Sequence, residues 1–212
     1  MKFQFNYESN QGDMRLHEAI AACDLSRIQE HIENGIDVNQ LNCKEGSTPL
    51  TEAVFLGHFE IIKILIEAGA NLQQFDYQPA TPLGMAAELG NIEAVQLLLR
   101  AGADVNAGGL QSPLDRAVSQ AHINVTNILI NAGADVNSTD EIGFTPLMIA
   151  ALSGDLDVVQ LLVEAGANVN AVDEYKNTAL RKASENSHQD VFNYLYPLTN
   201  AKFPYIDEGI PF

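Results

Sequence analysis

The side chains of this 212-residue chain that could do chemistry are its histidines and its many carboxylates, as metal ligands or as general acids and bases. Three histidines, His58, His122 and His188, each follow a small residue at equivalent places along the chain. Because the place is shared, we expect a structural role for the three, which would not converge on one ligand. The sequence contains no His-x-x-x-His pair and no glycine-rich phosphate loop after a strand. We therefore expect no catalytic, metal-binding or cofactor-binding residues.

The carboxylates give the chain a strongly acidic character instead. Asp and Glu number 28 against 11 Lys and Arg, a net charge of -17. The stretch 138–170 has five acids and no base, and two of these, Asp155 and Asp157, suit the start of a helix rather than acid-base catalysis. An acidic surface repels nucleic acid and anionic lipid and favours basic partners. Solubility alone would also explain the charge.

A recurring five-residue string of the form Gly-Ala-Asp-Val-Asn indicates which elements carry the histidines and carboxylates. Successive copies are 34, 33, 31 and 33 residues apart. They begin at Gly35, Gly69, Gly102, Gly133 and Gly166. A period of this size predicts stacked supersecondary units rather than one globular core.

A second string, Thr-Pro-Leu or a variant of it, keeps the same period. Its copies begin at Thr48, Thr81, Ser112, Thr145 and Thr178. The hydroxyl can cap a helix, and Pro at the first helical position gives up only an amide without a helical partner. A small residue at 57, 90, 121, 154 or 187 then separates two helices, and the Gly of the first string ends the second helix in a left-handed conformation. Each unit is predicted to be a turn, a short helix, a turn, a longer helix and a loop.

Together, Thr-Pro-Leu, the paired alanines, Leu-Leu and Gly-Ala-Asp-Val-Asn resemble the ankyrin repeat over roughly residues 14 to 200. The resemblance implies an all-α ankyrin-repeat solenoid of about six helix-turn-helix units with short hairpin-like turns. We place the units at 14–39, 40–73, 74–106, 107–137, 138–170 and 171–200. Outside them lie an N-terminal extension, 1–13, and an aromatic C-terminal tail, 201–212, which is either a cap on the last unit or a peptide that docks to another protein.

Ligands of the ankyrin family usually meet the concave face, formed by the turn tips and the exposed side of the first helix, and the resemblance implies the same here. Exposed aromatic and apolar residues at these places would be the anchors of an interface, unless they pack on neighbouring turns. The predicted anchors are Phe55, Leu56, Tyr77, Leu89, Ile142, Phe144, Leu152 and Tyr175. Glu88, Gln111, Glu141, Glu174 and Glu185 complete the predicted partner-binding set.

The fourth unit departs from the pattern. Seven positions separate Asn106 from Pro113, where the corresponding step is nine in the neighbouring units. Gly108 and Gly109 fill this shortened turn. It either makes a notch or kink in the binding face or simply completes the same turn with fewer residues.

These observations predict a non-enzymatic adaptor, assembly factor or inhibitor, monomeric when unbound, whose protein partner has a basic or apolar-plus-basic surface. The alternative is an acidic mimic that blocks a basic or nucleic-acid-binding site on its target. A regulatory part of an enzyme whose catalytic part is another chain also fits. We expect no nucleic-acid binding, because the chain is acidic. We also expect no membrane insertion and a cytoplasmic location, because the sequence has no 18-residue apolar run and no secretion signal at its start.

Overall fold

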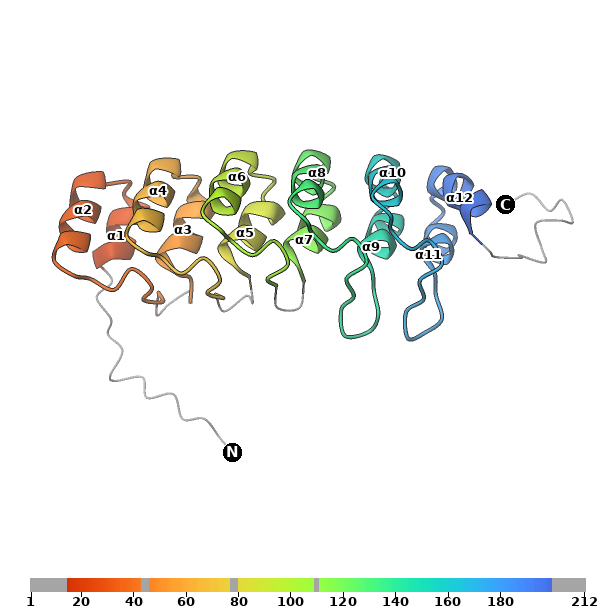
Figure 1. The fold of residues 1–212 in the computed structure, drawn as a ribbon, viewed down its shortest axis with the longest axis horizontal. Helices are drawn as coiled ribbons and strands as arrows, with labels where there is room; N and C mark the ends of the chain where they lie inside the picture. Colours follow the sequence, from red (N-terminus) through yellow and green to blue (C-terminus); the bar gives the residue numbers. More distant parts are fainter. Residues whose placement is uncertain (1–14, 43–45, 77–79, 109–110, 200–212) are drawn as a thin grey trace, which may run out of the picture. The chain divides into compact units, whose positions relative to one another are not determined.

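The computed structural model describes residues 15–42, 46–76, 80–108 and 111–199. Within these ranges the chain forms twelve α-helices and one short 3-10 helix and no strand, which confirms the predicted all-α fold (Figure 1). The helices form pairs: α1 Arg15–Ala21 with α2 Leu25–Glu33, α3 Pro49–Leu56 with α4 Phe59–Glu67, α5 Pro82–Glu88 with α6 Ile92–Arg100, α7 Pro113–Ser119 with α8 Ile123–Asn131, α9 Pro146–Ser153 with α10 Leu156–Glu164, and α11 Ala179–Glu185 with α12 Gln189–Leu195, followed by η1 Tyr196–Leu198. The predicted extension, the predicted tail and Tyr77 lie outside the described residues.

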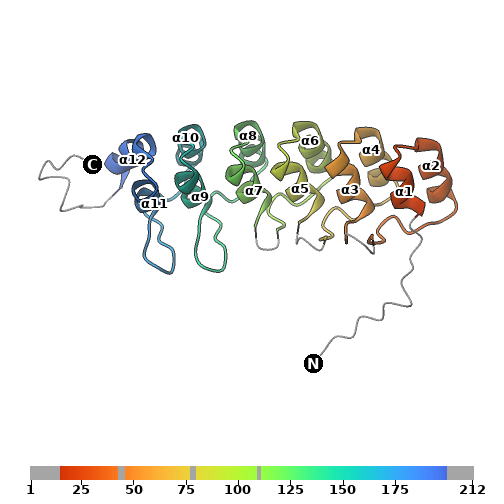
Figure 2. The ribbon, with the colours of Figure 1, turned by 180° about the vertical axis from the view of Figure 1, so that it is seen from behind.

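The chain divides into two compact bodies, Met1–Asp135 and Val136–Phe212. In the first body α1 packs on α3, α3 on α5 and α5 on α7, while α4 packs on α6 and α6 on α8. In the second body α9 packs on α11, α10 packs on α12, and η1 lies against α12. Within each body, successive helix pairs stand side by side in chain order (Figures 1 and 2). Each helix pair falls inside one predicted unit, and the stacking is that of a repeat solenoid.

The first helix of each pair after the first begins where the second string predicts. The Oγ1 atom of Thr48 accepts a hydrogen bond from the Thr51 amide at 2.9 Å, and Ser112 and Asp115 form a reciprocal capping box. The leucine that follows the cap enters the core: Leu50 and Leu83 are 1% and 0% exposed. The same string therefore both starts the helix and supplies the side chain that holds it against its neighbours.

The turn inside each pair requires a residue with positive φ. Gly57 and Gly90 supply it at 70° and 67°, whereas Cys23, Ala121 and Ser187 adopt it at 52°, 56° and 62°. A left-handed conformation costs an L-residue about 1–2 kcal/mol. The turns without glycine are therefore strained positions that the surrounding packing maintains.

The last residue of the first string ties neighbouring loops together. Asn106 Oδ1 accepts from the Asp135 amide at 2.9 Å, and its Nδ2 donates to the Gly133 carbonyl at 3.3 Å. Asn137 makes the equivalent pair of bonds, to the Asn168 amide and the Gly166 carbonyl, in the second body. Gln73 holds this place in the second loop, and its buried Oε1 has no hydrogen-bond partner. Asn106 and Asn137 therefore tie neighbouring loops, and the tie at Gln73 is missing.

The shortened fourth turn depends on Gly108. A Cβ on this residue would lie 2.4 Å from the Gln111 carbonyl oxygen and 2.7 Å from Ser112 Cα. Since real Cβ atoms do not approach backbone so closely, the chain can close this turn only with glycine.

Candidate partner-binding site

In the first body, the predicted anchors lie where the first helices end. Phe55 and Leu56 are the last two residues of α3 and are 63% and 40% exposed. Leu89, which follows α5 at the place equivalent to Leu56, is 42% exposed. Ala53 and Val54, the two residues directly before Phe55 on α3, are fully buried. Because α3 packs on α5, these helix ends present large apolar side chains to solvent on two adjacent pairs.

Apolar residues at the start of the second helices extend this surface, and the sequence prediction missed them. Leu25, Ile92 and Ile123, the first residues of α2, α6 and α8, are 38%, 40% and 40% exposed. Of the seven large hydrophobic residues that are exposed among the described residues of the first body, all but Phe75 lie within two residues of a turn inside a helix pair. The signal was available, since an apolar residue recurs at this place in five units.

Glu88, a member of the predicted partner-binding set, is engaged within the protein. Its carboxylate accepts a hydrogen bond from Nη1 of Arg116 on α7, a side chain that is only 11% exposed. Its carbonyl accepts from Nε2 of His122 at 3.0 Å. His188 donates in the same way to the Leu152 carbonyl in the second body, also at 3.0 Å. The structural role predicted for these two histidines is thus confirmed.

The remaining predicted residue of the first body is Gln111. It is exposed and directly precedes Ser112, the N-cap of α7. With Tyr77 outside the described residues, the described part of the predicted set in this body is Phe55, Leu56, Glu88, Leu89 and Gln111.

In the second body, the predicted residues lie mainly on two successive turn tips, 140–144 and 173–177. Ile142 is 38% exposed and Tyr175 is 66% exposed, and Glu141 and Glu174, directly before them, are exposed as well. The Glu174 amide donates to the Ile142 carbonyl at 3.0 Å, so the two tips are in direct contact. The structure therefore brings four predicted residues together.

Phe144 differs from the other predicted anchors because it is half-buried. The Lys182 ammonium on α11 lies 4.8 Å from the centre of its ring, within the range of a cation–π interaction. The same ammonium is 3.2 Å from Oδ2 of Asp173, whose side chain is inaccessible to solvent. Phe144 packs on the neighbouring unit, which is the alternative that the sequence left open.

The surroundings of Asp173 act on its pKa in opposite directions. Burial alone would raise the pKa. The backbone amide and side chain of Asn177 and the ammonium of Lys182 outweigh burial, so the pKa of Asp173 lies below its usual value. The carboxylate is therefore charged over the ordinary pH range and holds the turn and α11 together.

Tyr175 and Glu174, both exposed, interact on the same tip. A hydrogen bond to the Glu174 carboxylate and the negative charge of that group raise the pKa of the Tyr175 phenol. The phenol stays neutral at ordinary pH, and the exposed ring keeps its apolar character.

Leu152 and Glu185 occupy equivalent helix-end places on α9 and α11. Leu152 is 42% exposed, and Glu185 is exposed and pairs with Arg181 at 2.8 Å. They lie at the ends of helices rather than on the turn tips, so the predicted residues of the second body form two groups.

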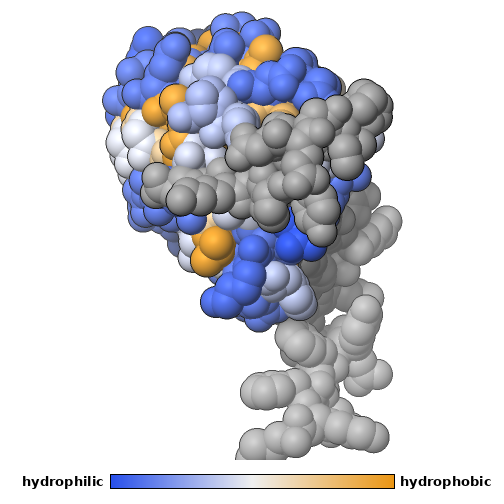
Figure 3. Space-filling model, turned by 90° about the vertical axis from the view of Figure 1, so that its right-hand side faces the viewer, coloured by the Kyte–Doolittle hydropathy of each residue, from blue (hydrophilic) through white to orange (hydrophobic). Residues whose placement is uncertain are grey.

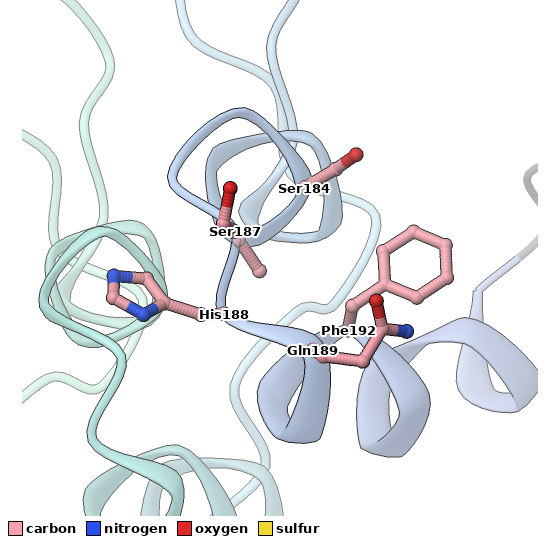
Figure 4. A pocket seen from close by; sticks show the side chains of 6 residues that line it. Ser184, Ser187, His188, Gln189 and Phe192 are labelled. Carbon is pink, nitrogen blue, oxygen red and sulfur yellow. The ribbon is translucent and has the colours of Figure 1, made fainter. Parts of the chain in front are cut away.

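A shallow hollow of about 80 Å³ lies between α11 and α12 (Figure 4). His188, whose ring also reaches the Leu152 carbonyl on α9, lines it together with Gln189 and Phe192. Polar groups do not converge in it, so it lacks the arrangement of a small-molecule site.

Viewed from the α12 side, the described surface is mostly hydrophilic with small separate apolar areas (Figure 3).

Neither a metal centre nor a membrane span emerges from the described residues. They contain no group of three or more His, Cys, Asp or Glu side chains placed to hold a metal ion. Their helices are too short and too polar to cross a bilayer.

Comparison with known proteins gives the family. The family model "Ankyrin repeats (3 copies)" matches residues 16–108 and 111–205. A stretch of 64 residues is 34% identical to Ankyrin repeat domain-containing protein 40 of Mus musculus, and a stretch of the same length is 34% identical to that of Homo sapiens. The match covers 30% of this chain but less than a fifth of those proteins, 18% and 17%. Ankyrin repeats indicate a protein–protein interaction module, and proteins with such repeats are typically not enzymes. Because the family model accounts for most of the residues and the helix pairs repeat with its period, the chain belongs to the ankyrin repeat family.

Proposed function

We propose that this chain is a non-enzymatic adaptor, assembly factor or inhibitor that binds a protein partner on its turn tips and on the ends of its first helices. The observation that carries the proposal is the exposure of Phe55, at 63%, beside Leu56 and next to Leu89 on the adjacent pair. The packing of the helices leaves these side chains uncovered. Large exposed aromatic and aliphatic groups are typical anchors of protein interfaces.

The charge of the chain supports a partner with basic groups around its apolar contact residues. With 28 acidic and 11 basic residues, the chain attracts positive and repels negative surfaces. The same charge opposes self-association, so we also propose that the chain is monomeric when unbound.

The helix-end surface can be tested by affinity capture from the cells in which the protein occurs. We expect a protein retained by the wild-type chain to be lost, by at least about ten-fold, with the double substitution Phe55→Ser and Leu89→Ser, because the two apolar anchors are removed. Gln96→Ser with Asn127→Ser is the matched control, since both residues are exposed in the same body but lie on second helices, away from the turn tips and the ends of the first helices. Circular dichroism would verify that all variants fold. Equal retention by the double variant and the wild type would contradict the proposed face.

A second candidate function, the acidic mimic, is favoured by the stretch 138–170 with five acids and no base. Capture at low and high salt separates the two. A complex held by apolar anchors persists at 500 mM NaCl, whereas a complex that imitates nucleic acid dissociates steeply as salt is raised.

A further inference from the structure

The two turn tips of the second body carry an exposed apolar patch. Ile142, Val172 and Tyr175 are 38%, 49% and 66% exposed. They are three of the five large hydrophobic residues exposed among the described residues of this body, the others being Leu152 and Leu198. We call this patch, together with Glu141 and Glu174, the tip ledge.

Backbone contacts make the two tips one surface. The Glu174 amide donates to the Ile142 carbonyl at 3.0 Å. Gly143 packs so closely that a Cβ on it would lie 3.4 Å from Asp173 Cα and 3.6 Å from the Val172 carbonyl oxygen. Ile142 therefore stands beside Val172 and Tyr175 although 30 residues or more separate them in the sequence.

The ledge is already held in shape by the protein itself. Asp140 Oδ1 accepts from the amides of Ile142 and Phe144 at 3.0 and 2.8 Å. Asp173 Oδ1 accepts from the Asn177 amide at 2.8 Å, and its other oxygen meets Lys182. A surface that is ordered before binding loses little conformational entropy when a ligand arrives.

The aspartates and glutamates of the tips have different roles. Asp140 and Asp173 bond to the backbone of their own turns, whereas Glu141 and Glu174, at equivalent places next to them, are exposed beside the apolar patch, and Glu174 also accepts from the Tyr175 phenol. Lys176 is the one base within 140–144 and 173–177. Two exposed carboxylates around apolar side chains form a surface whose complement is apolar with positive charges on either side.

The rest of the second body strengthens this preference. Residues 136–199 contain nine acidic and three basic side chains. Two of the three bases already pair internally, Arg181 with Glu185 and Lys182 with Asp173. The field around the ledge is therefore negative, and a segment with positive charges is drawn to it.

We propose that the tip ledge binds an extended segment of the partner protein in which apolar residues lie between two Lys or Arg residues. This inference rests on the proposed function and names the partner's chemistry at one site. The two glutamates sit one repeat apart, and packed helices are about 8–10 Å apart. An extended chain rises about 3.3 Å per residue, so basic residues three positions apart match the two glutamates. The apolar residues between them cover Ile142, Val172 and Tyr175.

A short peptide with the sequence Gly-Ser-Lys-Leu-Val-Lys-Ser-Gly is the probe. Titrated into the ¹⁵N-labelled full chain at 50 mM NaCl, it is expected to shift the amide signals of Ile142, Glu174 and Tyr175. Replacement of both lysines in the peptide by glutamate should abolish the shifts. Lys176→Gln should tighten binding about two-fold, because it removes the base from the tips.

The decisive comparison uses two double variants that remove the same charge from the same body. Glu141→Gln with Glu174→Gln should weaken peptide binding about three-fold or more, whereas Asp157→Asn with Glu164→Gln, on α10, should change it less than 1.5-fold. Equal weakening by both pairs, or shifts that miss the tips, would overturn the proposal. Failure here leaves the result for Phe55 and Leu89 unaffected, so the two proposals fail separately.

Discussion

At the scale of single residues, Asp140 and Asp173 show how neighbouring copies of one turn can differ. Both carboxylates accept backbone amides of their own tips. Asp140 is exposed, whereas Asp173 is 2% exposed and has the Lys182 ammonium as a further partner. Removal of a buried carboxylate leaves its charged and amide partners unsatisfied. Replacement of Asp173 therefore lowers the stability of the protein more than replacement of the exposed Asp140.

The lowered pKa of Asp173 predicts a pH-dependent contribution to stability. Because the pKa is lower in the folded than in the unfolded chain, the contribution is present above the unfolded value, about 3.9, and is lost as the pH falls through the folded value. Asp173→Asn should therefore lower the urea midpoint at pH 7, and the gap to the wild type should narrow below about pH 4. Asp140→Asn, the control, should have a smaller effect at pH 7. A gap for Asp173→Asn that is constant from pH 7 to pH 3 would be inconsistent with this role.

At the scale of the elements, the turn inside a helix pair is also the place where successive pairs interlock. His122 reaches back from the start of α8 to the carbonyl of Glu88 at the end of α5. Its ring occupies the space next to Gly90, where a Cβ would approach ring atoms to 2.7 Å. Gly57, with nearly the same φ, has no atom within 4 Å of such a Cβ. Gly57 is therefore required only for its backbone conformation. Gly90 is required both for its backbone conformation and for the space that the His122 ring occupies.

This difference predicts unequal effects of one substitution at two equivalent turns. Gly57→Ala should destabilise the protein by about 1 kcal/mol through its positive φ alone. Gly90→Ala should cost about 1–3 kcal/mol more, because the methyl group collides with the His122 ring. Thermal or urea unfolding of both variants would measure the difference.

A double-mutant cycle supplies the control. His122→Ala should recover part of the loss in the Gly90→Ala background but none in the Gly57→Ala background. The steric explanation would be refuted by the same loss at both glycines, or by a rescue that does not depend on which glycine is replaced.

At the scale of the whole molecule, the net charge of -17 is the dominant electrostatic property. Some of the 11 bases form local ion pairs, such as Arg116 with Glu88 and Lys182 with Asp173. Because the acids number 28, the negative charge far exceeds what the bases can neutralise. Self-repulsion of this kind favours the expanded, unfolded chain.

Screening should therefore stabilise the protein. Between about 10 mM and 150 mM NaCl the Debye length falls from about 30 Å to about 8 Å. We expect the midpoint of thermal unfolding at pH 7 to rise by several degrees over this range. Calorimetry in a single buffer would measure it, with sucrose of equal osmolality as the control for non-ionic effects. A midpoint that falls with salt would mean that ion pairs outweigh the repulsion.

The elements that the sequence predicted correctly depend on local chemistry. The Thr48 hydroxyl caps α3 by accepting from the amide of Thr51, three residues later, and Gly57 ends the same helix. Both effects act within one helical turn, so a short motif is sufficient to predict where the helix begins and ends. The ties made by Asn106 were predictable too, because identical loops recur at a fixed distance and neighbour one another in a stack.

The parts of the candidate site that could not be predicted depend on residues far apart in the sequence. The half-buried state of Phe144 follows from Lys182, 38 residues later, at a position that the repeat pattern leaves free. The burial of Asp173 and the exposure of Asp140 cannot be distinguished from their two similar turns, because the difference lies in what packs over them. The exposure of Ile92 and Ile123 was missed because anchors were expected only at the turn tips and on the first helices, whereas these residues begin second helices.

The shortness of the helices has a consequence for the folding of the chain during its synthesis on the ribosome. All twelve described α-helices have between seven and nine residues, below the length of about 12–15 at which an isolated helix becomes even marginally stable. The pair α1 and α2 therefore gains a lasting partner only when translation has passed the end of α4 at Glu67 and that segment has left the exit tunnel. At about 5–20 residues per second the nascent chain spends several seconds with its apolar helix faces uncovered. During that interval the repulsion between its many carboxylates opposes the association of neighbouring nascent chains.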